Sequence, residues 1–155
     1  MILTVQFPMK LDSLANMREH WGKRSARAKK HRERTIIHIG NRMVEGALPK
    51  GPPWLVKITR LGPKTLDASD NLNISAKSIR DGVADVLGID DGSNDASWIY
   101  DQEKTKKYQV RIEIFGGLEA LSEITEIQKR EKQKFTDQVN QGKQNDSSRS
   151  SKLDP

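Results

Sequence analysis

Charged side chains gather around one predicted helix, over residues 71–87, at positions that suit phosphodiester chemistry. The set comprises Asp67, Asp70, Lys77, Asp81, Asp90 and Asp91. Magnesium prefers oxygen ligands and keeps several waters, so roughly two to four carboxylates around an open site fit the hydrolysis of a phosphodiester. A nearby lysine can stabilise charge developing on the phosphate or orient the attacking water. If the loops before and after the helix converge beside it, the set predicts a divalent-metal site with a lysine next to it.

Each member of this set also has a purely structural interpretation. Asp70 suits the N-cap of the helix, because aspartate is among the preferred residues there. Lys77 and Asp81, four residues apart, suit a surface ion pair, and residues 90–92 suit a turn. An EF-hand is not indicated, because the spaced acids and the closing glutamate of that loop are missing.

Hydrophobic periodicity predicts the elements that must position these residues. Leu3, Val5 and Phe7 alternate as in a strand, and Gly88 falls where the helix over residues 71–87 should end. The predicted elements are a strand over 2–7, a helix over 21–43, a strand over 54–61, a helix over 71–87, and two strands over 98–100 and 108–115 that form a hairpin.

The order of these elements predicts an α/β (α+β) fold in a single domain, with a small mixed β-sheet packed against helices. We expect this domain to span residues 1–117 and a C-terminal helix to span 118–137. Residues 138–155 are dominated by Asn, Gln, Ser and Lys and have no apolar face, so they predict a disordered polar tail.

Basic residues are concentrated in the first predicted helix and the loop before it. Between residues 18 and 34 there are eight basic residues against two acids, and the rest of the chain is balanced. The eight are Arg18, Lys23, Arg24, Arg27, Lys29, Lys30, Arg32 and Arg34. A localised basic patch on a neutral protein is expected for a polyphosphate partner such as nucleic acid, although a solvated helix face would have the same composition.

Composition excludes several other classes of protein. There is no cysteine, which removes disulfide scaffolds and thiolate zinc sites. No apolar run approaches the ~20 residues that span a bilayer, and no charged leader precedes the first apolar residues. We therefore expect neither secretion nor membrane insertion, and a cytoplasmic location.

Taken together, the spaced residues resemble the RusA-like crossover junction endodeoxyribonucleases of the prophage type, a family of Holliday junction resolvases. The resemblance rests on Asp70-Asn71, Lys77, Asp81 and Asp90-Asp91, which follow the family's order of Asp-Asn, helical lysine, aspartate and Asp-Asp pair. The N-terminal part is also similar, with a first strand ending in proline and Asn16 to Trp21 opening a basic helix. The resemblance covers about residues 2–116.

The resemblance implies a magnesium-dependent, homodimeric enzyme, with manganese as a substitute metal, that cuts branched DNA such as four-way junctions by paired hydrolysis. It implies Asp70 and Asp91 as metal-binding, catalytic carboxylates and Lys77 as the catalytic lysine. Asp67 and Asp90 are the further candidate ligands, and Asn71 and Asp81 support them. The basic residues listed above would bind phosphates of the branched arms.

The sequence departs from the family pattern in two places. The family's first carboxylate falls at Ala68 here, and Asp67, one residue earlier, is the nearest acid. The lysine lies seven residues after Asp70, where the shorter pattern has four, a difference of nearly one helical turn. Ala68 motivates an alternative function, a catalytically inactive module that binds branched DNA.

Two smaller questions stay open from the sequence. The basic run alone would also suit an RNA- or ribosome-associated protein, although this leaves the acidic cluster unexplained. Trp21 suits either stacking on an unpaired base or packing under the basic helix. The histidines at positions 20, 31 and 38 are interpreted as part of the polar surface of the helix and not as metal ligands.

Overall fold

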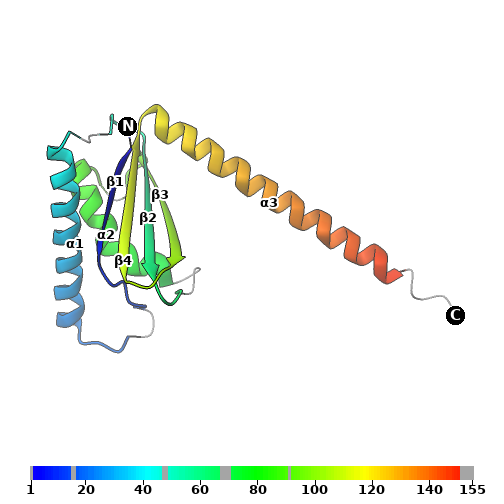
Figure 1. The fold of residues 1–155 in the computed structure, drawn as a ribbon, viewed down its shortest axis with the longest axis horizontal. Helices are drawn as coiled ribbons and strands as arrows, with labels where there is room; N and C mark the ends of the chain where they lie inside the picture. The colour runs from blue at the N-terminus through cyan, green and yellow to red at the C-terminus, as the bar shows by residue number, and fades with distance from the viewer. Residues whose placement is uncertain (1, 15–16, 47–48, 67–70, 91, 151–155) are drawn as a thin grey trace. The chain divides into compact units, whose positions relative to one another are not determined.

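The computed structural model describes four strands and three helices. The described residues are 2–14, 17–46, 49–66, 71–90 and 92–150, with side chains up to residue 138. The elements are β1 (Leu3–Pro8), α1 (Trp21–Val44), β2 (Trp54–Gly62), α2 (Asn71–Leu87), β3 (Ala96–Lys104), β4 (Gln109–Gly116) and α3 (Leu118–Ser150) (Figure 1). Contacts divide the chain into one unit, Met1–Ala120, that carries the sheet, α1 and α2, and a second unit, Leu121–Pro155, that carries most of α3.

The four strands form one mixed sheet in the order β1-β4-β2-β3. β2 and β3 run parallel, and β4 is antiparallel to both β1 and β2. Together with the helices this is the predicted α+β class with a small mixed sheet. The predicted helix over residues 71–87 coincides with α2, and α1 begins at the predicted Trp21.

The predicted hairpin of the last two strands is wrong, because β4 lies between β1 and β2 and does not pair with β3. The side chains of Val110 and Ile112 in β4 are fully buried, so β4 gains more from a central position than the charged strand β3 would. The connection crosses the end of β2, where Thr105 N donates to Gly62 O at 3.0 Å. Gly62 permits this crossing, since a Cβ there would lie 2.8 Å from Tyr108 Cδ1.

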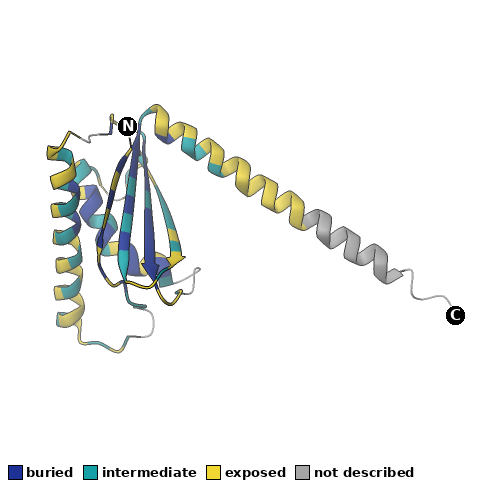
Figure 2. Ribbon diagram, viewed as in Figure 1, coloured by how far each residue is buried: buried dark blue, intermediate teal, exposed yellow. Residues whose placement is uncertain are grey.

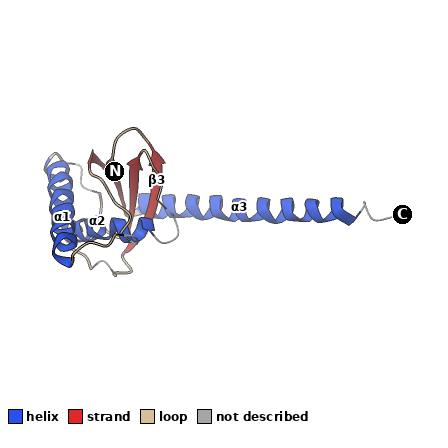
Figure 3. Ribbon diagram, turned by 90° about the horizontal axis from the view of Figure 1, so that it is seen from below, coloured by secondary structure: helices blue, strands red, loops and turns tan. Residues whose placement is uncertain are grey.

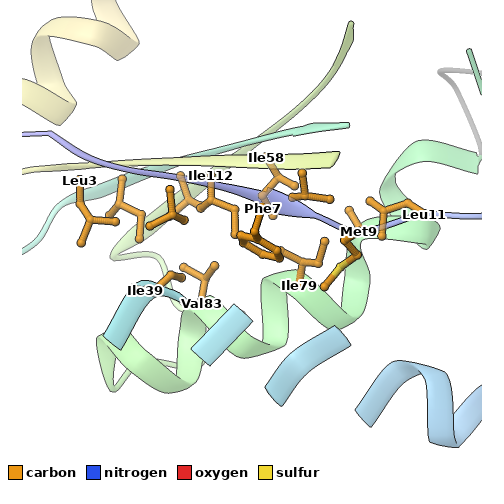
Figure 4. Close-up of a cluster of buried hydrophobic side chains, with 14 of the residues drawn as sticks. Leu3, Phe7, Met9, Leu11, Ile39, Ile58, Ile79, Val83 and Ile112 are labelled. Atoms are coloured by element: carbon orange, nitrogen blue, oxygen red, sulfur yellow. The ribbon is translucent and has the colours of Figure 1, made fainter. Parts of the chain in front are cut away.

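α1 and α2 cover the same face of the sheet (Figure 3). Ile39 from α1 and Ile79 from α2 lie in one buried cluster with Phe7 and Ile112 of the sheet (Figure 4). In Figure 2 the buried residues follow the strands and the inner side of α2, and exposed residues run along the outer side of α1. The charged side chains of the two helices are therefore left on their outer surfaces and at the groove between them.

The two helices approach each other closely at Gly82 of α2. A Cβ at this position would lie 2.9 Å from Arg32 O and 3.1 Å from Thr35 Cβ of α1. Only a residue without a side chain fits such a contact without movement of the α1 backbone. Gly82 therefore sets the spacing of α1 and α2 at the middle of the groove.

α3 extends further than the sequence indicated. The predicted helix ended at residue 137 and was followed by a disordered tail, whereas the structure continues the helix through Ser150. Residues 138–150 contain no proline, and extending an existing helix avoids the unfavourable nucleation step. Residues 151–155 of the predicted tail lie outside the described part of the chain.

Candidate functional site

Lys77 and Asp81 form an ion pair on the side of α2 that borders α1. Lys77 Nζ lies 3.2 Å from Asp81 Oδ1 and 3.5 Å from Oδ2. The Lys77 side chain is 67% exposed and that of Asp81 28%. The pair is held in place by the opposite face of α2, where Leu72, Ile79 and Val83 are buried at helical spacing. Lys77 is thus carried by a helix that packs against the core, and its side chain is open to solvent.

Two clefts between α1 and α2 share Lys77 and Asp81 as lining residues. The first, which we call the Arg24 cleft, has a volume of about 340 Å³. It is lined by Asp12, Leu14, Arg24, Ser25, Arg27, Ala28, His31, Ile74, Ser75, Lys77, Ser78 and Asp81. Its walls combine small or apolar side chains with guanidinium groups, a mixture that suits a ligand with an apolar body and an anionic end.

The second cleft, which we call the Asp85 cleft, has a volume of about 350 Å³. Its lining residues are Arg32, Lys77, Asp81, Ala84, Asp85, Ile89 and Asp90. Arg32 donates two hydrogen bonds to Asp85, from Nε at 2.5 Å and from Nη2 at 2.7 Å. The guanidinium group lowers the pKa of the Asp85 carboxyl by hydrogen bonding and by its charge.

Asp85 is a residue of this site that the sequence interpretation missed. Its pairing with Arg32 joins α1 to α2 across 53 positions of the sequence, and no local pattern predicts such a contact. One available signal was the spacing of Asp81 and Asp85, which are four residues apart and therefore neighbours on one side of α2. Arg32 is consequently engaged within the protein, which makes it a weaker candidate for phosphate binding than predicted.

The loop that contributes Asp12 and Leu14 to the Arg24 cleft is held by a buried guanidinium group. Arg60 is 3% exposed, and its Nε donates to Leu11 O at 3.1 Å and its Nη1 to Lys64 O at 2.6 Å. Burial lowers the pKa of Arg60. Ser75 Oγ donates to Asp12 O at 2.7 Å and ties the same loop to α2. These contacts fix the position of one wall of the cleft.

Four of the predicted positions, Asp67, Ala68, Asp70 and Asp91, lie outside the described residues, as does Asn16 of the N-terminal motif. The chain on either side of the first three is well fixed. Gln102 of β3 accepts from Leu66 N and donates to Leu66 O, both at 2.8 Å. Asn71 begins α2, and within the described chain its buried Oδ1 accepts no hydrogen bond.

Asp90, also a predicted ligand, lies after the other end of α2. The helix ends with Gly88 at a φ of +66°, and Ile89 N donates to Ala84 O at 3.1 Å, which turns the chain back. Asp90 Oδ1 accepts from Gly92 N at 2.8 Å, as in the structural interpretation of residues 90–92 as a turn. Asp90 still lines the Asp85 cleft.

The described neighbours of the predicted metal ligands lie far apart in the structure. α2 has 17 residues and is therefore about 24 Å long between its first and last Cα atoms. Asn71 and Asp90, the neighbours of Asp70 and Asp91, flank opposite ends of it. Among the residues that the structure describes, no three acidic or histidine side chains are grouped as metal ligands. The described carboxylates of the Asp85 cleft are oxygen donors of the right kind, but they do not by themselves fit a magnesium ion.

The predicted basic residues divide by their partners. Arg24 and Arg27 line the Arg24 cleft, and Arg27 Nη2 lies 2.7 Å from Glu19 Oε2. Lys29 Nζ is 3.9 Å from Glu33 Oε1, a weak exposed pair. Arg18, Lys23 and Lys30 are exposed, whereas Arg34 is half-buried. The surface available to phosphates is thus centred on the first half of α1.

The three histidines have different surroundings, and only His20 is fully on the surface. His20 Nδ1 accepts from Gly22 N at 3.2 Å and caps α1. His38 stacks on Phe7 with the ring centroids 4.2 Å apart. His31 lines the Arg24 cleft, and burial, followed by the charge of Arg27, lowers its pKa.

Comparison with known proteins did not identify a family for this chain. The sequence matched no protein-family model and gave no match among curated proteins. The resemblance to the RusA-like family therefore stays a prediction that rests on the residues quoted above. Within the described part of the chain, no helix is long and apolar enough to cross a bilayer.

Proposed function

We propose that this protein is a magnesium-dependent endodeoxyribonuclease that cuts branched DNA, such as Holliday junctions, in recombination and repair. The observation that carries the proposal is the position of Lys77, which lies on a rigid helix where two clefts meet and opposite the basic α1. A solvent-accessible ammonium group beside a basic surface is suited to a phosphodiester. The order of acidic and basic residues along the chain supports the same reaction.

The role proposed for Lys77 is to stabilise negative charge that develops on the phosphate in the transition state. Asp81 would act as a positioning residue, because its carboxylate accepts from Lys77 Nζ at 3.2 Å and limits the conformations of the lysine. The pair is i, i+4 on one helix, so the direction of the ammonium group is set by α2. Phosphate approaching Lys77 must compete with Asp81.

Magnesium is the proposed cofactor, with manganese as the expected substitute. We propose Asp67, Asp70, Asp90 and Asp91 as its ligands and Asn71 as a supporting residue, from the resemblance and from the preference of magnesium for oxygen donors. When bound, the ion would supply Lewis acidity for the attack of water on the phosphate. Because the described carboxylates do not fit the ion on their own, no further step is assigned to it.

A homodimer is the proposed state of the enzyme. A four-way junction has two-fold symmetry, so paired incision requires two active sites related in the same way.

The second candidate is a module of the same fold that binds branched DNA without cutting it. Ala68, at the position where the family has its first carboxylate, favours this candidate. Exposed basic residues such as Arg18, Lys23 and Lys30 would serve either function, because phosphate contacts give affinity without hydrolysis. Metal-dependent cutting separates the two candidates.

The test is incision of a labelled synthetic four-way junction, compared with a linear duplex of the same sequence. We expect paired cuts near the crossover with magnesium or manganese and none with a chelator. Tight junction binding with no cuts under any metal would favour the inactive module. Binding to neither substrate would refute both candidates.

A substitution at Asp70 tests the assigned ligand against the capping interpretation. Asn caps a helix about as well as Asp but lacks the negative charge. We therefore expect Asp70→Asn to abolish cutting while junction binding and the urea midpoint stay at the wild-type values. The matched control is Asp101→Asn in β3, which lines neither cleft and should cut normally. Normal cutting by Asp70→Asn would remove this residue from the site.

A further inference from the structure

Trp21 is a large aromatic side chain left on the surface at the start of α1. It is 76% exposed, whereas Trp54 is 8% exposed and Trp98 lies under the guanidinium of Arg80, 5.0 Å from its ring centroid. The interpretation that Trp21 packs under the basic helix is therefore wrong. The described ring contact of Trp21 is with His20, at 5.5 Å between centroids and tilted by 36°, which leaves most of the indole accessible.

The position of Trp21 links it to the Arg24 cleft. It precedes Arg24 and Ser25 by three and four residues, and residues at this spacing share one side of a helix. Both of these residues line the Arg24 cleft. The indole is therefore one helical turn beyond the cleft, on the side of α1 that forms the cleft wall.

The chemistry of the cleft matches that of a nucleotide. Leu14, Ala28 and Ile74 supply apolar surface, which suits the face of a base. Arg24 supplies positive charge, which suits a phosphate, whereas Arg27 is paired with Glu19 at 2.7 Å. The two carboxylates that also line the cleft have cationic partners, since Asp12 lies 2.7 Å from Lys10 Nζ and Asp81 lies 3.2 Å from Lys77 Nζ. The acids therefore do not cancel the positive charge of α1.

We propose that Trp21 and the Arg24 cleft form a subsite for an unpaired nucleotide of branched DNA. The base stacks on the Trp21 indole, and Arg24 binds the adjoining phosphate. Since Lys77 lines the same cleft, the strand so held would lead to the ammonium group. The proposal deepens the function proposed above and rests on it. It predicts that the protein binds DNA whose strands open at a branch point better than closed duplex.

Binding measured in the presence of a chelator tests this subsite without cutting. The probes are a thymidine oligonucleotide, a duplex and a four-way junction, with tryptophan fluorescence and affinity both recorded. We expect the oligonucleotide and the junction to quench wild-type fluorescence and Trp21→Ala to bind them about 5- to 150-fold more weakly, the range for loss of one base–aromatic stack. Trp21→Phe should keep most of the affinity and lose the quenching.

The matched control is Ile37→Ala. Ile37 is 57% exposed on the same helix but lines neither cleft, so its truncation should leave oligonucleotide and junction binding unchanged. Wild-type affinity in Trp21→Ala, or an equal loss in Ile37→Ala, would overturn the subsite. A uridine ribonucleotide probe that binds more tightly than its thymidine counterpart would overturn the assignment to DNA.

These outcomes are distinguishable from failure of the proposed function. Quenching and Trp21-dependent binding without any junction cutting would refute the nuclease and leave the nucleotide subsite standing. Metal-dependent cutting together with normal binding by Trp21→Ala would refute the subsite and leave the nuclease standing.

Discussion

Replacing Gly82 with alanine should push α1 and α2 apart. The added Cβ would lie 2.9 Å from the backbone oxygen of Arg32 and 3.1 Å from Thr35 Cβ. The backbone oxygen belongs to a regular turn of α1 and cannot move alone, so relief requires a shift of one helix relative to the other. Such a shift would alter both the Arg24 cleft and the Asp85 cleft, because the helices form their walls.

Two opposing effects decide the sign of the change in stability. Alanine is favoured over glycine inside a helix by about 0.8 to 1 kcal/mol. Overpacking of a close contact costs about 1 to 3 kcal/mol, and contact with backbone places this case in the upper part of that range. The net prediction is that Gly82→Ala lowers the free energy of unfolding by about 1 to 2 kcal/mol.

Gly40→Ala provides the matched control for this prediction. Gly40 lies inside α1, and a Cβ built there would meet nothing within 4 Å. This variant should therefore raise the free energy of unfolding by up to about 1 kcal/mol, since only helix propensity changes. Urea unfolding of both variants, monitored by circular dichroism, measures whether each substitution raises or lowers the free energy of unfolding. If Gly82→Ala is as stable as Gly40→Ala, the close approach of the helices is not as described.

Two further predictions concern the guanidinium groups that hold the clefts. Arg60→Met should lower the free energy of unfolding by about 2 to 4 kcal/mol, because the carbonyls of Leu11 and Lys64 lose their donors; a loss below about 1 kcal/mol in urea unfolding would contradict this. The pair with Arg32 lowers the pKa of Asp85 in the folded protein below its ordinary value of 3.8. The pair therefore stabilises the fold above pH 3.8, and this stabilisation is lost as the pH falls through the pKa of the folded state. The difference in stability between wild type and Arg32→Ala should therefore shrink from about pH 7 to about pH 2, and an equal difference at both would refute the coupling.

The sequence was sufficient for elements whose signal is local. The apolar spacing of Leu72, Ile79 and Val83 and the glycine at position 88 defined α2 with its observed ends. The order of elements also predicted the α+β class. The hairpin was wrong because adjacency along the chain was the only guide to pairing, whereas burial of Val110 and its neighbours determines that β4 is central.

The geometry of the site, unlike the helices and strands, depends on contacts between residues that are distant in the sequence. The ion pair of Lys77 and Asp81 was the structural alternative to their catalytic roles, and it forms because their spacing on a helix brings them together. The contact of Arg32 with Asp85 and the role of Gly82 depend on how two helices pack, which no single helix pattern determines. The two acidic loops were expected to converge, but this expectation ignored the length of the helix between them. That helix, α2, places their described neighbours Asn71 and Asp90 at its opposite ends.

The strand order also has a consequence for the synthesis of the chain. In the described sheet β1 pairs with β4 alone, so residues 3–8 have no partner until residues 109–116 have been made, about a hundred residues later. At roughly 5 to 20 residues per second, the first strand leaves the ribosome about 5 to 20 s before the last strand. During this time β2 and β3 can pair around α2, while the backbone of β1 lacks its strand partner. Closure of the sheet must therefore wait until β4 has been made.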